Sequence, residues 1–358
     1  MSEPVQRSLP SALVGRMFVH PIFDYALIGG VLSLLVAAVV VGHSEAQGVG
    51  YMDVSDASKT FAVTLPFFIL FSNHAHFAAS TVRLYTKPGT FQALPFLTMC
   101  FPLVCLAVLT LFVYSPIALG PNLVKLYLTW SPFHYAAQAF GLAVMYSYRS
   151  GCQLKPTDKR LLWWVCMIPF LFNFLTGPDV GLNWLTHLYL PAGTYRLLNY
   201  LVGALALVTA ILLFAKVWRS NGSPMPLISL MMIISNGVWW FVLAPLQAFV
   251  YATIFHGVQY LAIVIMFHVK DQIARPENRR PTLYHVAWFY GASLLLGYGL
   301  FYCMPRGYAL AGFDLTESLL LSIAAINIHH FVVDAYIWRL GKSDSNRQVV
   351  DSLQPALG

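Results

Sequence analysis

The sequence predicts an all-α protein, a polytopic transmembrane helical bundle of about ten spans, and three observations lead to this class. Of the 358 residues, 58% are hydrophobic and only 10% are charged, whereas soluble domains carry roughly 25% charged residues. The mean hydropathy is +0.66. Apolar runs of about 20 residues, long enough to cross a bilayer, recur from the first tens of residues almost to the C-terminus. We therefore expect a single integral membrane domain, residues 1–358, and not a soluble globular protein.

Ten apolar segments are the candidate spans. Hydropathy windows place them near residues 23–42, 60–82, 91–114, 124–147, 160–176, 199–218, 226–244, 247–269, 283–303 and 317–338. The first begins as a signal peptide would, but the apolar run from Phe23 to Val41 is too long for a cleaved segment. Spans seven and eight are divided only near Pro245, so their boundary is the least distinct.

The basic residues predict the orientation of the spans, because cytoplasmic loops collect Lys and Arg. With the N-terminus inside, 17 of the 21 Lys and Arg residues fall on the cytoplasmic side, and the exceptions are Lys59, Lys125, Arg196 and Arg306. We expect both termini to be cytoplasmic, with tails 1–20 and 341–358, in a multi-pass protein of the inner or plasma membrane. The lipid bilayer is thus a partner. Nucleic acid is not, because the basic residues form no patch interleaved with exposed aromatics.

Histidines inside the spans are the main functional clue. Six of the 11 histidines fall well within predicted spans two, four, eight and ten, namely His74, His76, His134, His256, His329 and His330. An ionisable group in a bilayer costs on the order of a few kcal/mol unless it is paired, binds a ligand or lines a wet cavity. A lone histidine is commonly a packing residue with satisfied hydrogen bonds. Six on spans of one direction favour a metal site.

The depth of these histidines allows one site or two. Counted at 1.5 Å per residue from the inner basic boundary, His76 and His330 lie roughly 10 to 14 Å deep, and His134 and His256 roughly 21 to 23 Å. Two layers about 10 Å apart are one arrangement. Helix tilt would merge them into a single layer.

Most of these histidines have a polar neighbour at helical spacing, since residues four apart share a helix face. The second-shell or additional ligand candidates are Asp334 beside His330, Gln138 beside His134, Tyr260 beside His256, and the pair His20 and Asp24 at the start of span one. Such groups orient metal-bound imidazoles; the alternative is a local hydrogen bond. Within the doublets, His74 and His76 are separated by about 200° around a helix and His329 and His330 by about 100°, so one member of each doublet is expected in a shared site.

Several neutral imidazoles with one carboxylate suit iron, zinc, copper or manganese, and no cysteine lies beside these positions. The segments His20-Pro-Ile-Phe-Asp24 and His134-Tyr-Ala-Ala-Gln138, with the histidines of spans two and ten, resemble the scattered motifs of bacterial membrane β-carotene dioxygenases of the Brp/Blh type. Those are multi-span non-haem iron enzymes that cleave a lipid-soluble polyene. The longer HFGxxD-like signature of that family is absent, as are the HxxHH boxes of membrane desaturases. The resemblance therefore implies a chemistry class and not a substrate.

We expect a membrane-embedded metal-dependent oxidoreductase, a His-ligated iron oxygenase with a lipophilic small-molecule substrate and, where turnover requires it, an electron donor. Non-haem iron is the expected cofactor, with haem, zinc and copper as alternatives. Two other functions remain open: a haem protein for electron transfer or haem modification, and a transporter in which His and Asp form a relay.

Overall fold

The computed structural model describes residues 9–46, 69–177, 179–243 and 245–338, and these form helices joined by short turns with no strand among them. The all-α prediction is confirmed. By length and composition, five helices of the described residues could cross a membrane: Phe96–Tyr114, Ala192–Asn221, Ala248–Ile273, Thr282–Leu310 and Leu315–Ile337. A sixth is possible if the helices Pro21–Ile28 and Val31–Gly42, bent by 51°, form one broken span. The predicted tails are residues 1–20 and 341–358. Residues 1–8 and 339–358, which include most of these tails, lie outside the described residues.

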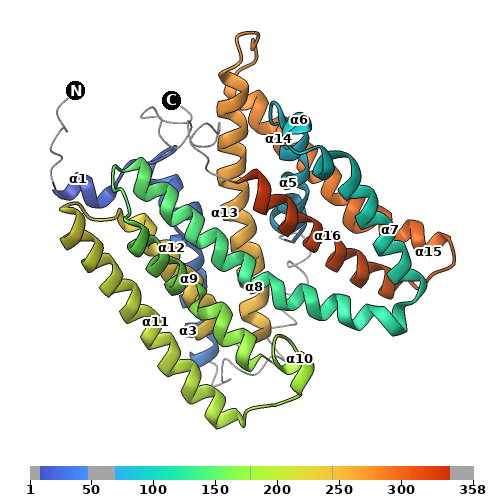
Figure 1. Ribbon diagram of the computed structural model, residues 1–358, viewed down its shortest axis with the longest axis horizontal. Helices are drawn as coiled ribbons and strands as arrows, with labels where there is room; N and C mark the ends of the chain where they lie inside the picture. Colours follow the sequence, from blue (N-terminus) through green and yellow to red (C-terminus); the bar gives the residue numbers. More distant parts are fainter. Residues whose placement is uncertain (1–8, 47–68, 178, 244, 339–358) are drawn as a thin grey trace.

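The helices form two groups that meet along α8 (Figure 1). On one side of it lie α9, α11 and α12, and on the other α5, α7, α13, α14 and α16. The bounds are α5 Ala75–Thr86, α7 Phe101–Tyr114, α8 Pro116–Arg149, α9 Pro156–Thr176, α11 Ala192–Asn221, α12 Leu227–Val242, α13 Pro245–Ile273, α14 Thr282–Tyr298 and α16 Leu315–Ile337. Contacts of α8 with α16 and of α12 with α13 join the groups.

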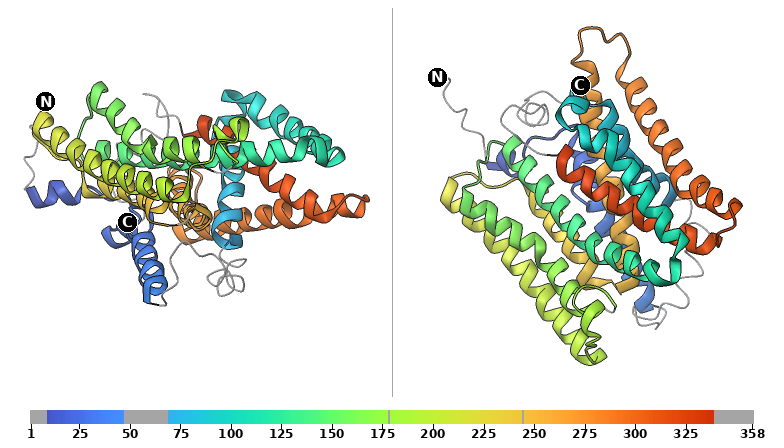
Figure 2. Two further views of the ribbon diagram at one scale, coloured as in Figure 1. Left: turned by 90° about the horizontal axis from the view of Figure 1, so that it is seen from below. Right: turned by 45° about the vertical axis from the view of Figure 1, so that its right-hand side comes forward.

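The N-terminal segment packs beneath this arrangement. It comprises α1 (Leu9–Val14), α2 (Pro21–Phe23), the π-helical turn η1 (Asp24–Ile28) and α3 (Val31–Ala46). Figure 2 shows α3 standing steeply across the long helices α8 and α11. Arg149 at the end of α8 fixes the segment, since its Nε donates to the carbonyl of Met17 at 3.0 Å and its guanidinium lies 4.4 Å from the Phe18 ring centroid.

Turns of π-helix interrupt the α-helices close to several of the histidines. The π-helical turn η2 (Ile69–His74) leads directly into α5, and the turn η4 (Gly299–Cys303) follows α14 and leads into α15 (Met304–Leu310). A further π-helical turn, η3 (Phe96–Cys100), precedes α7. Such turns are rare and often occur at functional sites. Pro121 and Pro132 lie inside α8, where a proline removes an intrahelical hydrogen bond and bends the helix, and α8 is visibly curved in Figure 1.

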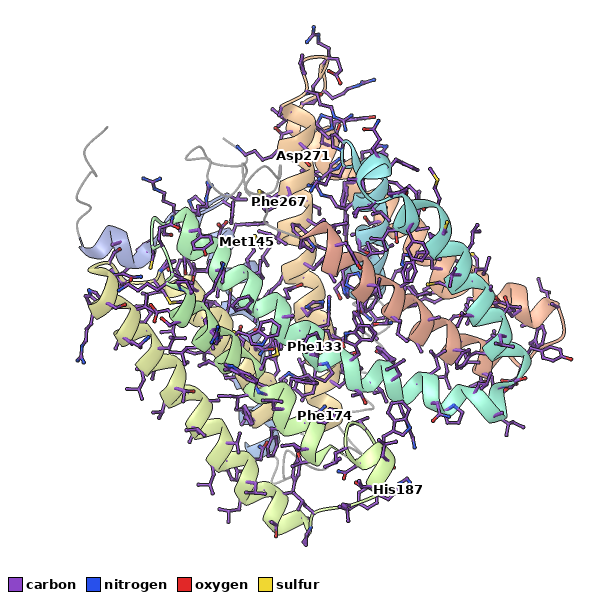
Figure 3. All side chains as sticks on the ribbon, viewed as in Figure 1. Phe133, Met145, Phe174, His187, Phe267 and Asp271 are labelled. Carbon is purple, nitrogen blue, oxygen red and sulfur yellow. The ribbon has the colours of Figure 1, made fainter. Side chains whose placement is uncertain are left out.

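The helices that carry the predicted site run in a common direction for much of their length. In Figure 1, α8, α13 and α16 all end toward the upper part of the molecule. Asp271, labelled in Figure 3, lies at this end of α13, and His187 lies at the opposite end of the molecule. Arg83 near the end of α5 pairs with Asp271 at 2.7 Å. Side chains from these helices can therefore meet at one depth.

Candidate metal centre

Four imidazoles from four helices form a closed ring in the interior. His76 lies on α5, His134 on α8, His256 on α13 and His330 on α16. The ring centroids are 4.9 Å apart for His76 and His256, 4.9 Å for His256 and His134, 4.9 Å for His134 and His330, and 4.8 Å for His330 and His76. Each pair meets edge to face. We call this set the four-histidine ring.

The ring is buried and holds nitrogens without partners. His76, His256, His330 and His134 are 0%, 1%, 0% and 8% exposed. Among the described residues, both ring nitrogens of His76, both of His256 and Nδ1 of His330 have no hydrogen-bond partner. Leaving a buried polar group unsatisfied costs about 1–3 kcal/mol. Each imidazole can offer one nitrogen to a given ion, so a bound cation would satisfy at most one of these atoms on each of the three residues.

The distances define two overlapping groups of potential metal ligands that share His330. Nε2 of His330 lies 3.2 Å from Nε2 of His134, close to the roughly 3 Å between adjacent nitrogens that are each about 2.1 Å from one ion. Potential ligand atoms of His76, His256 and His330 lie within 4.8 Å of one another, as do those of His134, His330 and Asp334. Opposite ligands of one ion are about 4.2 Å apart, so the most distant atoms within either group would each move inward by at most about 0.3 Å.

Asp334 adds a carboxylate to one side of the four-histidine ring. Its Oδ2 lies 3.4 Å from Nε2 of His330 and 3.8 Å from Nε2 of His134. Its Oδ1 accepts a 2.7 Å hydrogen bond from the hydroxyl of Tyr260, which is itself 1% exposed. The Tyr260 bond fixes the orientation of the carboxylate, so Asp334 can serve as a further ligand or as an acceptor for an imidazole N–H.

Gly257 permits the close approach of α13 to the start of α5. A Cβ at this position would lie 3.0 Å from Nδ1 of His76 and 3.0 Å from the carbonyl oxygen of Ser72. Both distances are tighter than ordinary van der Waals contact, so any larger residue would push His76 away from its neighbour His256. The glycine next to His256 therefore helps to bring these two imidazoles together.

The structure distinguishes the members of the two histidine doublets. His74 faces away from the four-histidine ring and stacks on Phe301, with centroids 4.0 Å apart and planes 6° apart. His329 likewise stacks on Phe101 at 5.2 Å. Neither residue belongs to the groups of potential ligand atoms. The expectation that only one member of each doublet points to a shared site agrees with this geometry.

The two possible layers of histidines merge into one. The depth count assumed that every helix ends at the same level, but α13 extends well beyond the end of α16 (Figure 1). His256 therefore lies many residues from Lys270 and yet contacts His76 directly, and His134 contacts both His256 and His330. A single layer replaces the two-layer arrangement.

His20 and Asp24 lie outside the four-histidine ring. Asp24 is fully buried and accepts hydrogen bonds from the backbone N–H groups of Phe18, Val19 and His20 at 2.5, 3.1 and 3.2 Å. A further bond comes from the Tyr146 hydroxyl at 2.9 Å. The side chain of exposed His20 accepts from its neighbour Ile22. This pair stabilises the N-terminal turn.

Gln138 is beside the centre but bonds to the backbone. Its Nε2 donates to the carbonyl of His256 at 3.3 Å and contacts Oε1 of Gln259 at 3.5 Å. Nε2 of Gln259 in turn donates to the carbonyl of Ile28 at 2.8 Å. Sequence reasoning missed Gln259, although its position three residues after His256 places it on a neighbouring part of the same helix face.

Comparison with known proteins provides no further evidence about this site. No protein-family model, no curated protein and no solved structure matches the chain. The function is therefore to be inferred from the residues of the site.

Proposed function

We propose that this protein is a membrane-embedded metal-dependent oxidoreductase, a non-haem iron oxygenase that acts on a lipophilic substrate. The observation that carries the proposal is the four-histidine ring, in which imidazoles from four helices meet and three of the four residues have buried nitrogens without partners. Imidazoles with one carboxylate are a suitable ligand set for iron. Zinc and copper accept the same ligands, so the identity of the metal is part of the proposal.

Each residue of the centre has a distinct role in this proposal. His76, His134, His256 and His330 hold the ion, which would supply oxygen binding and redox chemistry. Asp334, oriented by Tyr260, completes the ligand set or fixes the tautomer of an imidazole. Phe77 and Phe331 pack against the rings of His330 and His134 at 4.9 and 4.5 Å. These apolar side chains would exclude water from the reacting atoms.

Two alternative functions fit the site less well. A haem needs a flat slot between its axial ligands, whereas the four imidazoles contact one another edge to face with no such gap. A His/Asp relay for transport needs a water-lined path. The four-histidine ring is instead packed against aromatic rings, including Tyr135 at 4.5 Å from His256.

Metal analysis and spectroscopy of the purified protein test this proposal. We expect iron in stoichiometric amount, no Soret band, and an electron paramagnetic resonance signal of a ferrous nitrosyl complex when nitric oxide is added to the reduced protein. A Soret band would establish the haem alternative. Fully functional protein without metal would refute the proposal as a whole.

We also propose that the chain crosses the cell membrane about ten times, with both termini in the cytoplasm. The cytoplasmic side is inferred from the distribution of Lys and Arg, and two polar contacts support the grouping of the predicted cytoplasmic segments on one side. Arg83 pairs with Asp271, and Lys155 donates to the carbonyl of Ser220 at 3.0 Å. Segments that contact one another in this way must lie on the same side of the bilayer.

Cysteine accessibility in intact cells tests the orientation. Glu277 is exposed in the turn between α13 and α14, and Glu277→Cys is introduced after the exposed Cys100 and Cys303 are changed to serine. We expect a membrane-impermeant maleimide to label it only after the cells are opened. Labelling in intact cells would show that this turn is outside the cell and that the predicted orientation is wrong.

A further inference from the structure

A cavity opens beside the four-histidine ring, between α8, α13 and α16. Its volume is about 300 Å³, at the lower end of the range for small-molecule sites. Three residues of the metal centre, His134, Tyr260 and Asp334, form part of its wall. Figure 3 labels Phe133 and Met145, two further lining residues on α8. A molecule in this cavity would therefore contact the metal centre directly.

The rest of the lining is mostly apolar and aromatic. Trp130 and Phe133 come from α8, Phe331 comes from α16, and Trp338 lies at its C-terminal end. The cavity is partly open, since Phe133 is half-buried and Ala335 on its rim is exposed. Such a surface favours an apolar occupant, whose burial is stabilising in proportion to the apolar area removed from water.

Gln138 gives this apolar wall one neutral hydrogen-bond acceptor. Backbone carbonyls can only accept, so the bond to the His256 carbonyl identifies the contacting atom of Gln138 as Nε2. The same reasoning fixes the neighbouring amide, because Gln259 donates through Nε2 to the carbonyl of Ile28 and accepts through Oε1. Oε1 of Gln138 is left with no hydrogen-bond partner among the described residues, and Gln138 lines the cavity.

We infer that this cavity binds a membrane-dissolved apolar molecule that carries a hydroxyl group, and that Oε1 of Gln138 accepts the hydrogen bond of that hydroxyl. This inference rests on the proposed function, for which it defines the substrate class. The occupant lies with its hydroxyl end next to His134 and Asp334 and with its apolar part between the aromatic residues of α8 and α16. An analogue without the hydroxyl leaves the acceptor unpaired and binds more weakly.

Gly141 determines the space available for the occupant. It lines the cavity one helical turn after Gln138, and a Cβ built on it meets no atom within 4 Å. The Cβ of a leucine at this position would therefore enter open space. Gly291 on α14 is a matched control, because it is also half-buried in a helix, has equally open surroundings and does not line the cavity.

Photolabelling of the full-length protein in lipid nanodiscs tests this inference. The probes are a short alkyl diazirine with a terminal hydroxyl and the same diazirine with a methyl group in its place. Labelled peptides are quantified by mass spectrometry relative to an exposed peptide of α11, which carries none of the variants. We expect the alcohol to label the cavity segments 130–145 and 331–338 about fivefold more than the alkane, as one hydrogen bond allows.

The variants test the location of the binding site and the role of the hydroxyl group separately. Gly141→Leu should reduce cavity labelling by both probes at least about fivefold, whereas Gly291→Leu should leave it unchanged. Gln138→Leu should reduce alcohol labelling to the level of the alkane. Equal labelling by both probes in the unmodified protein, or alcohol labelling that persists in Gln138→Leu, would overturn the hydroxyl assignment. Cavity labelling that survives Gly141→Leu would overturn the site.

This experiment is independent of the proposed chemistry, because photolabelling requires neither a bound metal nor turnover. Absence of iron would refute the proposed function and leave the labelling pattern unchanged. Uniform labelling of all lipid-facing helices would refute the cavity and leave the metal centre unaffected.

Discussion

Replacing Asp24 by alanine is expected to destabilise the protein by about 2–6 kcal/mol, because two buried donors and two part-buried donors lose their common acceptor. The carboxylate accepts from the backbone N–H groups of Phe18, Val19 and His20 and from the hydroxyl of Tyr146. Each buried donor left without a partner costs about 1–3 kcal/mol. Thermal unfolding in detergent, followed by the loss of helical circular dichroism, measures the effect.

Asp24→Asn is the matched control, because it keeps the shape of the side chain and one acceptor oxygen. We expect an intermediate loss of stability for this variant. The protein that remains folded in either variant should keep its full metal content, since Asp24 bonds to backbone and to Tyr146 and not to the four-histidine ring. Metal loss with unchanged stability would instead make Asp24 a ligand, as the resemblance to membrane dioxygenases allowed.

Much of the candidate site could be predicted because membranes make ionisable residues conspicuous. His76, His134, His256 and His330 are found from composition and hydropathy alone, since histidine inside an apolar span is costly without a partner. Their companion Asp334 follows from the four-residue helical spacing. Helical periodicity also indicated that His330 and His329 face different directions.

Other features depend on tertiary geometry and could not be predicted. The single layer of histidines results from helices that end at different levels, which no count of residues from a basic boundary can reveal. Gly257 acts through the approach of α13 to His76 and Ser72, segments far apart in the sequence. The direction of the Gln138 amide depends on the carbonyl of His256, another contact between distant helices.

The fold shows the same division between local and tertiary information. All-helical structure follows from long apolar runs, because in lipid a helix satisfies every backbone hydrogen bond within its own segment. The turns of π-helix before α5 and after α14 could not be predicted. They have no distinct apolar pattern, and they adjust the packing of His74 on Phe301.

Replacing His330 by alanine is expected to have the largest effect on metal binding. His330 occurs in both groups of potential ligand atoms and contacts both His76 and His134 in the four-histidine ring. Loss of a residue that merely orients a ligand costs roughly 10- to 100-fold in metal affinity, so loss of a ligand itself should cost more than about 100-fold. The adjacent His329, stacked on Phe101, provides a control on the same helix.

The metal content of His330→Ala and His329→Ala, purified side by side with the unmodified protein and measured by mass spectrometry, tests the four-histidine ring most directly. The unmodified protein and His329→Ala should each contain about one iron per chain, and His330→Ala less than about a tenth of that amount. Equal metal content in the two variants, or loss in His329→Ala alone, would contradict a metal centre built from His76, His134, His256 and His330.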